Sequence, residues 1–325
     1  MLPLGERGRP LLRETYERAR AVADEVFVLT EVRQREIIEA VLTEVDDRHL
    51  ILEPSARGTT NAYGLAALTL IARDPDAVMV AMPADHVVRG GPKARSAVRS
   101  AARVAATSGS LVTVGLRPRF PSTGLGYIHA PGRPSGGALR VKRFIEKPDL
   151  ARARRFLKEG GYYWNLAWFA WRLPVLVDEL ARHAPSRLAA LRRVLAARAA
   201  GDEQGAARLY NRLPVDVIDR SVMEKTDRLL LVPGDFEWAD IGNWSELGDR
   251  VHPDARGNSV EGEAVLVDTH GSLVLGDRRL VAAIGLDDMI IVDTEDALLV
   301  CPRSRAQDVK KVVEALRRSR KTRYL

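Results

Sequence analysis

The stretch DAVMVAMPADHVV, Asp76–Val88, decides how the fold is interpreted. Its apolar part, Ala77–Pro83, lacks the polar–apolar alternation of a half-exposed strand and is therefore typical of a strand buried on both faces. The strand ends at Pro83, and a carboxylate, Asp85, follows two residues later. A carboxylate in this place is either an ordinary turn residue or part of a binding site.

Around this stretch, apolar strand patterns alternate with helical patterns from Leu11 to Gly115. The predicted helices are Leu11–Val22, Arg33–Val45, Thr59–Asp74 and Lys93–Gly109, and the predicted strands are Glu25–Thr30, His49–Pro54, Ala77–Pro83 and Ser110–Leu116. This order predicts an α/β fold with a doubly wound, mostly parallel sheet. Such sheets bind ligands beyond the carboxyl ends of their strands, which is where Asp85 falls.

The rest of the sequence predicts further elements of this α/β domain and then a second, smaller domain. Paired strands are expected within 124–148, an aromatic strand pair or strand and turn at 160–172, and a helix over 173–200. After Asn258 short β patterns follow closely, separated by Gly and Asp turns, and a basic helix, 306–321, ends the sequence. We place a boundary near Arg256, which gives an α/β domain over residues 1–256 and a small β-rich domain over 257–325.

Composition excludes several classes of protein. Of 325 residues, 46% are hydrophobic and 29% charged, as in soluble globular proteins. Lys and Arg exceed Asp and Glu by 50 to 43, but they are spread along helices without interleaved aromatic residues, so no nucleic-acid partner is expected. The single cysteine, Cys301, fits a reducing cytoplasm, and the longest charge-free run, 58–72, is too short to cross a bilayer. We therefore expect a cytoplasmic protein without a membrane partner.

Common catalytic motifs are missing from the sequence. It contains no G-x-x-x-x-G-K-[ST] loop, no H-E-x-x-H and no G-x-S-x-G, and its six histidines show no metal spacing. What remains is a set of polar residues in apolar or aromatic surroundings. They are Arg57 in LEPSARGTTNA, Asp85 in MPADH, Glu146 and Lys147 in RFIEKP, Asn165 in YYWNLAW, Asp219, Glu224 and Lys225 in VDVIDRSVMEKTD, and Asp240 in FEWADIGNW.

Each of these residues has a structural alternative. Asp85 and Asp240 suit turns or helix caps, Asn165 suits a bent strand, and a Glu–Lys pair on a surface contributes little. Several of them nevertheless fall at predicted strand ends, which favours a single ligand site. Two carboxylates at such a site suit Mg²⁺, which binds one or two protein carboxylates together with substrate phosphates.

The order of seven motifs resembles that of the bacterial mannose-1-phosphate guanylyltransferases, a branch of the sugar-phosphate nucleotidyltransferases. The motifs cover nearly the whole chain. They are EPSARGTT, MPADH, GYIHA, RFIEKPD, YYWNLAWFAWR, DVIDRSVMEKTD and EWADIGNW. The resemblance implies a nucleotide-diphospho-sugar transferase fold with a left-handed β-helix-like C-terminal domain, which this family often uses in homodimer contacts.

The resemblance also implies a reaction and a role for each residue. GTP and α-D-mannose 1-phosphate would give GDP-mannose and pyrophosphate. Asp85 and Asp240 would bind Mg²⁺, and Lys147 would face the sugar phosphate. Gly126, Glu146 and Asn165 would contact the sugar, Arg57 would lie near the nucleotide, and Asp219 and Lys225 would belong to the same site.

Two departures from the family pattern bear on these expectations. The family has Arg-Asn-Thr where this sequence has Arg57-Gly58-Thr59, and the sequence opens at MLPLGERGRP, which aligns after the family's glycine-rich phosphate loop. One interpretation is a start that lies roughly two dozen residues upstream. The other is a non-catalytic homologue that binds a sugar nucleotide or regulates a partner. Retention of Asp85, Glu146, Lys147 and Asp240 favours the first.

Overall fold

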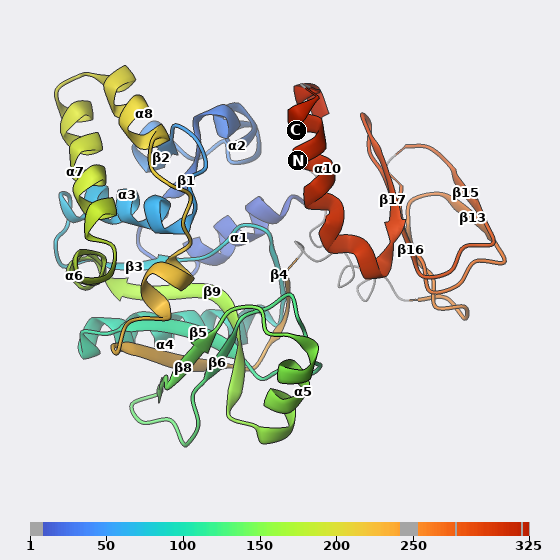
Figure 1. The fold of residues 1–325 in the computed structure, drawn as a ribbon, viewed down its shortest axis with the longest axis horizontal. Coiled ribbons are helices and arrows are strands. Elements are labelled where there is room, and N and C mark those ends of the chain that lie inside the picture. Colours follow the sequence, from blue (N-terminus) through green and yellow to red (C-terminus); the bar gives the residue numbers. More distant parts are fainter. Residues whose placement is uncertain (1–8, 241–252, 277, 320, 325) are drawn as a thin grey trace. The chain divides into compact units, whose positions relative to one another are not determined.

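The computed structural model describes residues 9–240, 253–276, 278–319 and 321–324 of the chain (Figure 1). The chain forms two compact units. The first consists of Met1–Ala84 and Val88–Glu237, and the second of Asp85–Val87 and Trp238–Leu325. Each unit has its own sheets, and each is described by itself.

The first unit alternates strands and helices, as the sequence predicts. Its helices are α1 (Leu11–Arg20), α2 (Arg35–Val41), α3 (Thr59–Ile71), α4 (Gly91–Ser108), α5 (Leu150–Glu159), α6 (Leu173–His183), α7 (Pro185–Ala199), α8 (Glu203–Asn211) and the π-helical turn η4 (Asp219–Met223). Its strands are β1 (Val28–Glu31), β2 (Leu50–Glu53), β3 (Val78–Ala81), β5 (Leu111–Leu116), β6 (Tyr127–His129), β7 (Leu139–Arg140), β8 (Arg143–Ile145), β9 (Tyr162–Arg172) and β10 (Leu229–Gly234).

The main sheet has the order β7-β10-β5-β9-β6-β8, with β3 also paired to β9. Strands β5 and β10 are parallel, while β9 runs antiparallel to β3, β5 and β6. Strands β3, β5, β6 and β10 therefore share one direction, and β1 and β2 form a separate parallel pair. The α/β fold class is confirmed, but the main sheet is mixed and not mostly parallel, since β7 and β8 also run antiparallel to their neighbours β10 and β6. The reversed β9 was not foreseen, because a strand buried on both faces has the same apolar pattern in either direction.

Helices cover both faces of the central part of this sheet, which explains why its central strands are largely apolar. Phe169 and Trp171 of β9 share one core cluster with Tyr63 of α3 and Leu176 and Leu180 of α6. Helix α4 packs its own buried residues against β3, β5, β9 and β10. Successive residues of β5 are all buried, as expected of a strand with helices on both sides.

The single helix predicted over residues 173–200 is two helices in the structure. Helix α6 ends at His183, and helix α7 begins at Pro185. Ala184 adopts φ −142° and ψ 49°, outside the helical region, because the proline ring disfavours a helical conformation in the residue before it. The chain therefore turns at this proline although the apolar periodicity continues across it.

The second unit contains a β-helix-like array of short strands, as expected for the C-terminal part. They are β12 (Ser259–Glu261), β13 (Ala264–Val267), β14 (Leu273–Leu275), β15 (Val281–Ile284), β16 (Met289–Asp293) and β17 (Leu298–Pro302), followed by α10 (Val309–Arg318). Strands β12, β14 and β16 pair in parallel, as do β13 and β15. Asn258 links successive turns, since its amide donates to the Thr269 carbonyl at 2.7 Å and accepts from the Ser272 N–H at 3.1 Å.

Within the described ranges, no helix is both long enough and apolar enough to span a bilayer.

Candidate functional site

The candidate site is built around a distortion in strand β9. Along the β5–β9 pair, Thr113 faces Phe169 but Gly115 faces Asn165, so β9 carries two residues more than β5 over this interval. Ala167, inside the interval, has a φ of 53°, which is rare for a residue with a side chain. Bulges of this kind re-aim side chains and are frequent beside functional sites. The bulge therefore sets the direction of the Asn165 side chain.

Two hydrogen bonds orient the Asn165 side chain. Its Oδ1 accepts the backbone N–H of Ala167 at 3.0 Å, and its Nδ2 donates to Oδ1 of Asp219 at 2.8 Å. A backbone N–H only donates, so the oxygen of the amide must face Ala167 and the nitrogen must face Asp219. One hydrogen of the amide nitrogen is then left for a ligand.

Gly126 lies against this amide and against the Glu146 carboxylate. The backbone N–H of Asn165 donates to the Gly126 carbonyl at 2.8 Å. A Cβ atom added at Gly126 would lie 2.8 Å from Oε2 of Glu146 and 3.3 Å from Cβ of Asn165. A side chain at position 126 would therefore displace the Glu146 carboxylate and fill the small space between these two side chains, one of which offers an acceptor and the other a donor.

Asp219 completes the cluster from the start of η4. The pKa of Asp219 is raised to about 6, first by burial and then by the negative charge of Glu146, although its hydrogen bonds with backbone and with Asn165 lower it. The turn is held to the start of α3, because the Ile218 N–H donates to Thr59 Oγ1 at 2.9 Å and the hydroxyls of Thr60 and Ser221 lie 2.8 Å apart. The structure thus brings four predicted residues together: Gly126, Glu146, Asn165 and Asp219.

Lys147 adds a cation beside this cluster. Its Nζ lies 3.5 Å from Oε1 of Glu146, and its side chain is 53% exposed against 20% for that of Glu146. Its backbone has a φ of 44°, a second left-handed residue near the site. Non-glycine residues in this conformation cost of order 1–3 kcal/mol and cluster at binding sites.

Two predicted residues have no described contact with the cluster. Arg57 is half-buried and donates from Nε to Ser55 Oγ at 3.3 Å, and its carbonyl accepts the Asp216 N–H at 3.1 Å. Lys225, just after η4, is exposed, and its side chain has no hydrogen bond or ion pair with any residue that the structure describes. Neither side chain is therefore placed against Gly126 by a described contact.

The structure gives a reason for Gly58, where this sequence departs from the family pattern. Gly58 has a φ of 81° and a ψ of 163°, a conformation that only glycine adopts freely. A Cβ atom there would lie 2.1 Å from the backbone carbonyl oxygen of Asp216. In this chain the close approach of two backbone segments excludes any side chain at position 58.

Asp240 ends, and Asp85 directly precedes, a two-stranded ribbon that the sequence did not predict. Strand β4 (His86–Arg89) pairs with β11 (Glu237–Asp240). The His86 ring contacts the Trp238 ring edge-on at 5.1 Å, while Gly90 approaches Phe236, so the strands run antiparallel. The start of β4 and the end of β11 thus share one end of the ribbon.

The Asp85 side chain is 66% exposed, and its Oδ1 lies 3.9 Å from Nε2 of His86. No lysine or arginine among the described residues pairs with it. Only the backbone of Asp240 is described, and the remainder of the EWADIGNW motif, 241–244, lies outside the described residues. In the part of the chain that the structure covers, no three His, Cys, Asp or Glu side chains form a metal cluster.

One strand-end carboxyl was missed by the sequence analysis. Glu53, the last residue of β2, is buried, faces Glu31 of β1 in register and accepts a hydrogen bond from the Tyr210 hydroxyl. Burial and, to a smaller extent, Glu31 raise the pKa of Glu53, while the Tyr210 bond lowers it. Its signal in the sequence is the one that drew attention to Asp85, a carboxylate at the carboxyl end of a buried strand.

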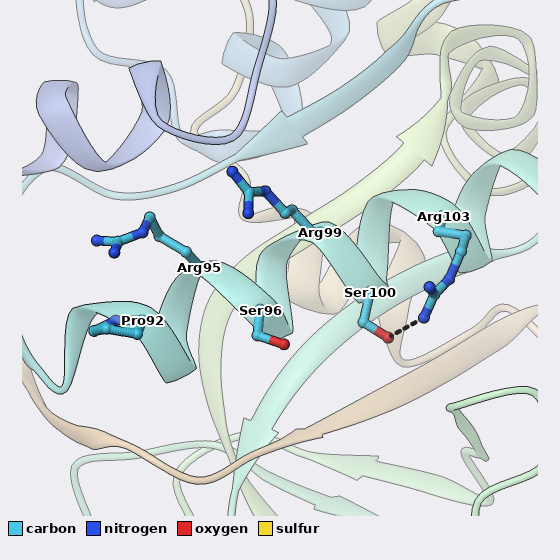
Figure 2. A pocket seen from close by; sticks show the side chains of 6 residues that line it. All are labelled: Pro92, Arg95, Ser96, Arg99, Ser100 and Arg103. Carbon is cyan, nitrogen blue, oxygen red and sulfur yellow. Dashed lines mark hydrogen bonds between the residues drawn. The ribbon is translucent and has the colours of Figure 1, made fainter.

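A separate pocket of about 420 Å³ lies along α4 and contains none of the predicted site residues. Figure 2 shows Arg95, Arg99 and Arg103 spaced along the helix, with the Arg103 guanidinium reaching the Ser100 hydroxyl. Arg99 donates to the Ala21 carbonyl at 2.7 Å. The spacing of four residues places these side chains on one face of the helix.

Comparisons with known proteins agree with the motif order. A nucleotidyl transferase family model matches residues 1–255, and a model of the mannose-phosphate isomerase/GMP-like β-helix domain matches residues 262–316. A putative mannose-1-phosphate guanylyltransferase of Vibrio cholerae is 34% identical, and a mannose-1-phosphate guanylyltransferase of Escherichia coli is 35% identical. Each alignment covers 97% of this chain and 68% of the relative.

A solved structure from Thermus thermophilus, described as a mannose-1-phosphate geranyltransferase, is also similar. It superposes with a TM-score of 0.82 at 33% identity, over 97% of this chain and 91% of that one. This likeness extends over both units of the chain. The chain therefore belongs to the nucleotidyl transferase family and, within it, to the group of mannose-1-phosphate guanylyltransferases.

Proposed function

We propose that this protein transfers a guanylyl group from GTP to α-D-mannose 1-phosphate, giving GDP-mannose and pyrophosphate. The observation that carries the proposal is the similarity of 97% of the chain to relatives named for this reaction. The cluster around Gly126 supports it, because three of its members, Gly126, Glu146 and Asn165, are the residues that the family resemblance assigns to the sugar.

The cluster has the chemistry that a sugar requires. A hydroxyl group both donates and accepts hydrogen bonds. Glu146 offers an acceptor and Asn165 a donor on either side of Gly126, so neighbouring hydroxyls of one sugar ring are satisfied together. Charge-assisted bonds to a carboxylate are about twice as strong as neutral ones, which favours Glu146 as the principal sugar contact.

We assign Lys147 to the phosphate of mannose 1-phosphate. Its exposed ammonium lies beside Glu146 and so beside the sugar position. In the reaction a phosphate oxygen of the sugar attacks the α-phosphorus of GTP, a new P–O bond forms, and the bond to pyrophosphate breaks. Lys147 neutralises charge on the attacking phosphate and holds it in line, and no covalent enzyme intermediate is involved.

Asp85 and Asp240 are the proposed ligands of Mg²⁺. The exposed Asp85 carboxylate fits this role, since no described lysine or arginine neutralises it and the β4–β11 ribbon places its backbone at the same end as that of Asp240. When bound, the metal would neutralise charge on the triphosphate. Carboxylate oxygens are the ligands that Mg²⁺ prefers.

The remaining assignments are also proposals. We place Arg57 near the nucleotide, and Asp219 and Lys225 in the same site. We propose a cytoplasmic homodimer without a nucleic-acid or membrane partner, and a domain boundary between residues 256 and 257. The ranges matched by the two family models, 1–255 and 262–316, support this boundary.

The test is the release of pyrophosphate from GTP in the presence of mannose 1-phosphate and Mg²⁺, with ATP, UTP and dTTP and with glucose 1-phosphate as alternatives. We expect turnover to depend on GTP and mannose 1-phosphate and to stop on chelation of the metal. Absence of turnover with every pair of substrates would refute the proposal.

A further inference from the structure

Asp219 contacts Asn165, and Asn165 in turn lies against Gly126. The side-chain atoms nearest to a Cβ at Gly126 belong to Glu146 and Asn165, the Asn165 Nδ2 at 3.7 Å. Asp219 instead contacts that same amide nitrogen at 2.8 Å. We propose that Asp219 is a positioning residue, which acts on sugar binding through the Asn165 amide and makes no contact with the sugar phosphate. This inference rests on the proposed function.

The geometry makes the effect of Asp219 specific. The Ala167 N–H fixes the amide oxygen, so the amide nitrogen can only point toward Asp219. With one of its hydrogens bound by Asp219, the direction of the second is set by the plane of the amide. Without Asp219 the amide retains only the Ala167 bond, and rotation about the side-chain torsions spreads the second hydrogen over several directions.

The carboxylate is itself held in place. It belongs to the first residue of η4, and this turn is anchored to α3 through the Thr59 hydroxyl and through the contact between Thr60 and Ser221. Both hydroxyl contacts are buried or half-buried. A residue that orients a ligand group must be rigid, and these anchors supply that rigidity.

The charges around Asp219 are acidic. Burial is the largest cause that raises the pKa of Asp219, to about 6, and the charges of Glu146, which follows β8, and of Glu224, which follows η4, add to the rise. The hydrogen bond from Asn165 and a backbone N–H oppose these effects. Asp219 therefore gains or loses its proton within an accessible pH range. A change in the Asn165 side-chain amide over the same pH range reports directly on the contact between Asp219 and Asn165.

The first experiment observes this contact without catalysis. In the full chain with ¹⁵N-labelled asparagine, the Asn165 side-chain amide signals are identified by their loss in Asn165→Ala. We expect these signals to shift with a midpoint near pH 6, and to lose that shift in Asp219→Asn. No shift in the unsubstituted chain, or an unchanged shift in Asp219→Asn, would overturn the inference.

The second experiment is a double-substitution cycle on the KM for mannose 1-phosphate. We expect Asp219→Ala and Asn165→Ala each to raise this KM about 10-fold, and the double variant to raise it about 10-fold as well, because both remove one oriented donor. The kcat and the KM for GTP should change by less than about 3-fold. Independent effects, which multiply to about 100-fold in the double variant, would contradict action through Asn165.

Two variants control for folding. Asp219→Asn keeps an acceptor oxygen and should restore the KM to within about 3-fold of the unsubstituted value. Asp227→Ala removes an 80% exposed carboxylate from the same segment and should change nothing. An unsubstituted chain that neither binds nor turns over mannose 1-phosphate would overturn the proposed function and the sugar-binding role, whereas the amide titration tests the contact between Asp219 and Asn165 alone.

Discussion

The raised pKa of Asp219 predicts that a substitution in the site stabilises the protein, and that it does so only above a certain pH. An aspartate in an unfolded chain has a pKa near 3.8, whereas in the folded protein that of Asp219 is about 6. The native state therefore binds this proton more tightly than the unfolded state. The stability that protonation adds is present at low pH and is lost as the pH rises through about 6.

The magnitude follows from the difference between the two pKa values. About 2 pKa units at 1.36 kcal/mol each correspond to roughly 3 kcal/mol of folding free energy lost between pH 4 and pH 8. Asp219→Asn cannot ionise, so it avoids this loss, and it keeps an oxygen that accepts the hydrogen bond from Asn165. We expect Asp219→Asn to be up to about 3 kcal/mol more stable than the unsubstituted protein at pH 8, and equally stable near pH 4.

The assay is urea unfolding at both pH values, followed by tryptophan fluorescence. Trp164, Trp168 and Trp171 are buried in the core of the first unit and report on its unfolding. Asp227→Asn, at an exposed carboxylate, is the matched control and should be neutral at both values. If Asp219→Asn were destabilising at pH 8, or changed stability equally at both values, the account of Asp219 as a strained buried acid would be wrong.

Three further substitutions separate steric, conformational and chemical roles. Gly126→Ala adds a Cβ 2.8 Å from a carboxylate oxygen that can move, so the KM for mannose 1-phosphate should rise more than about 10-fold while the melting temperature stays nearly constant. Gly58→Ala meets a backbone oxygen at 2.1 Å and should cost more than about 3 kcal/mol in urea unfolding. Its control, Gly109→Ala, shares a positive φ but has no described atom within 4 Å and should cost only about 1–2 kcal/mol. Asp85→Asn should lower kcat at least about 100-fold with unchanged stability, whereas a large loss of stability with activity preserved would identify a turn residue.

The sequence predicted the fold where local patterns decide it. Alternation of apolar strands and amphipathic helices identified the α/β class, and Gly and Asp turns between short strands identified the β-rich C-terminal part. It failed where distant segments decide the outcome. The pairing of β4 with β11 joins segments about 150 residues apart in the sequence, and the short run His86–Arg89 gave no sign of it. The break between α6 and α7 follows from Pro185 alone, since the residue before a proline avoids the helical conformation, whereas apolar periodicity predicts one continuous helix.

The site shows the same division. Asn165 among aromatic residues was a visible signal, and a carboxylate and a lysine at a strand end were another. The contact of Asn165 with Asp219, 54 residues further along the chain, depends on a bulge at Ala167, where no glycine marks a positive φ. Sequence alone therefore predicted the polar residues that the structure brings together in this cluster but left the role of Asp219 open.

The arrangement also explains why a carboxylate at position 219 is informative. A neutral amide there would accept the same hydrogen bond and would avoid the proximity of Glu146 and Glu224. A chain selected for stability alone would favour that amide, because an acid held near two others is destabilising when ionised. Groups that reduce stability in this way are concentrated at functional sites. Lys147 and Ala167, both in the left-handed region, add backbone strain in the same cluster. Three destabilising features therefore lie in one cluster of the first unit, the buried acid Asp219 and the left-handed residues Lys147 and Ala167. Their coincidence indicates that function, and not folding, determines these residues.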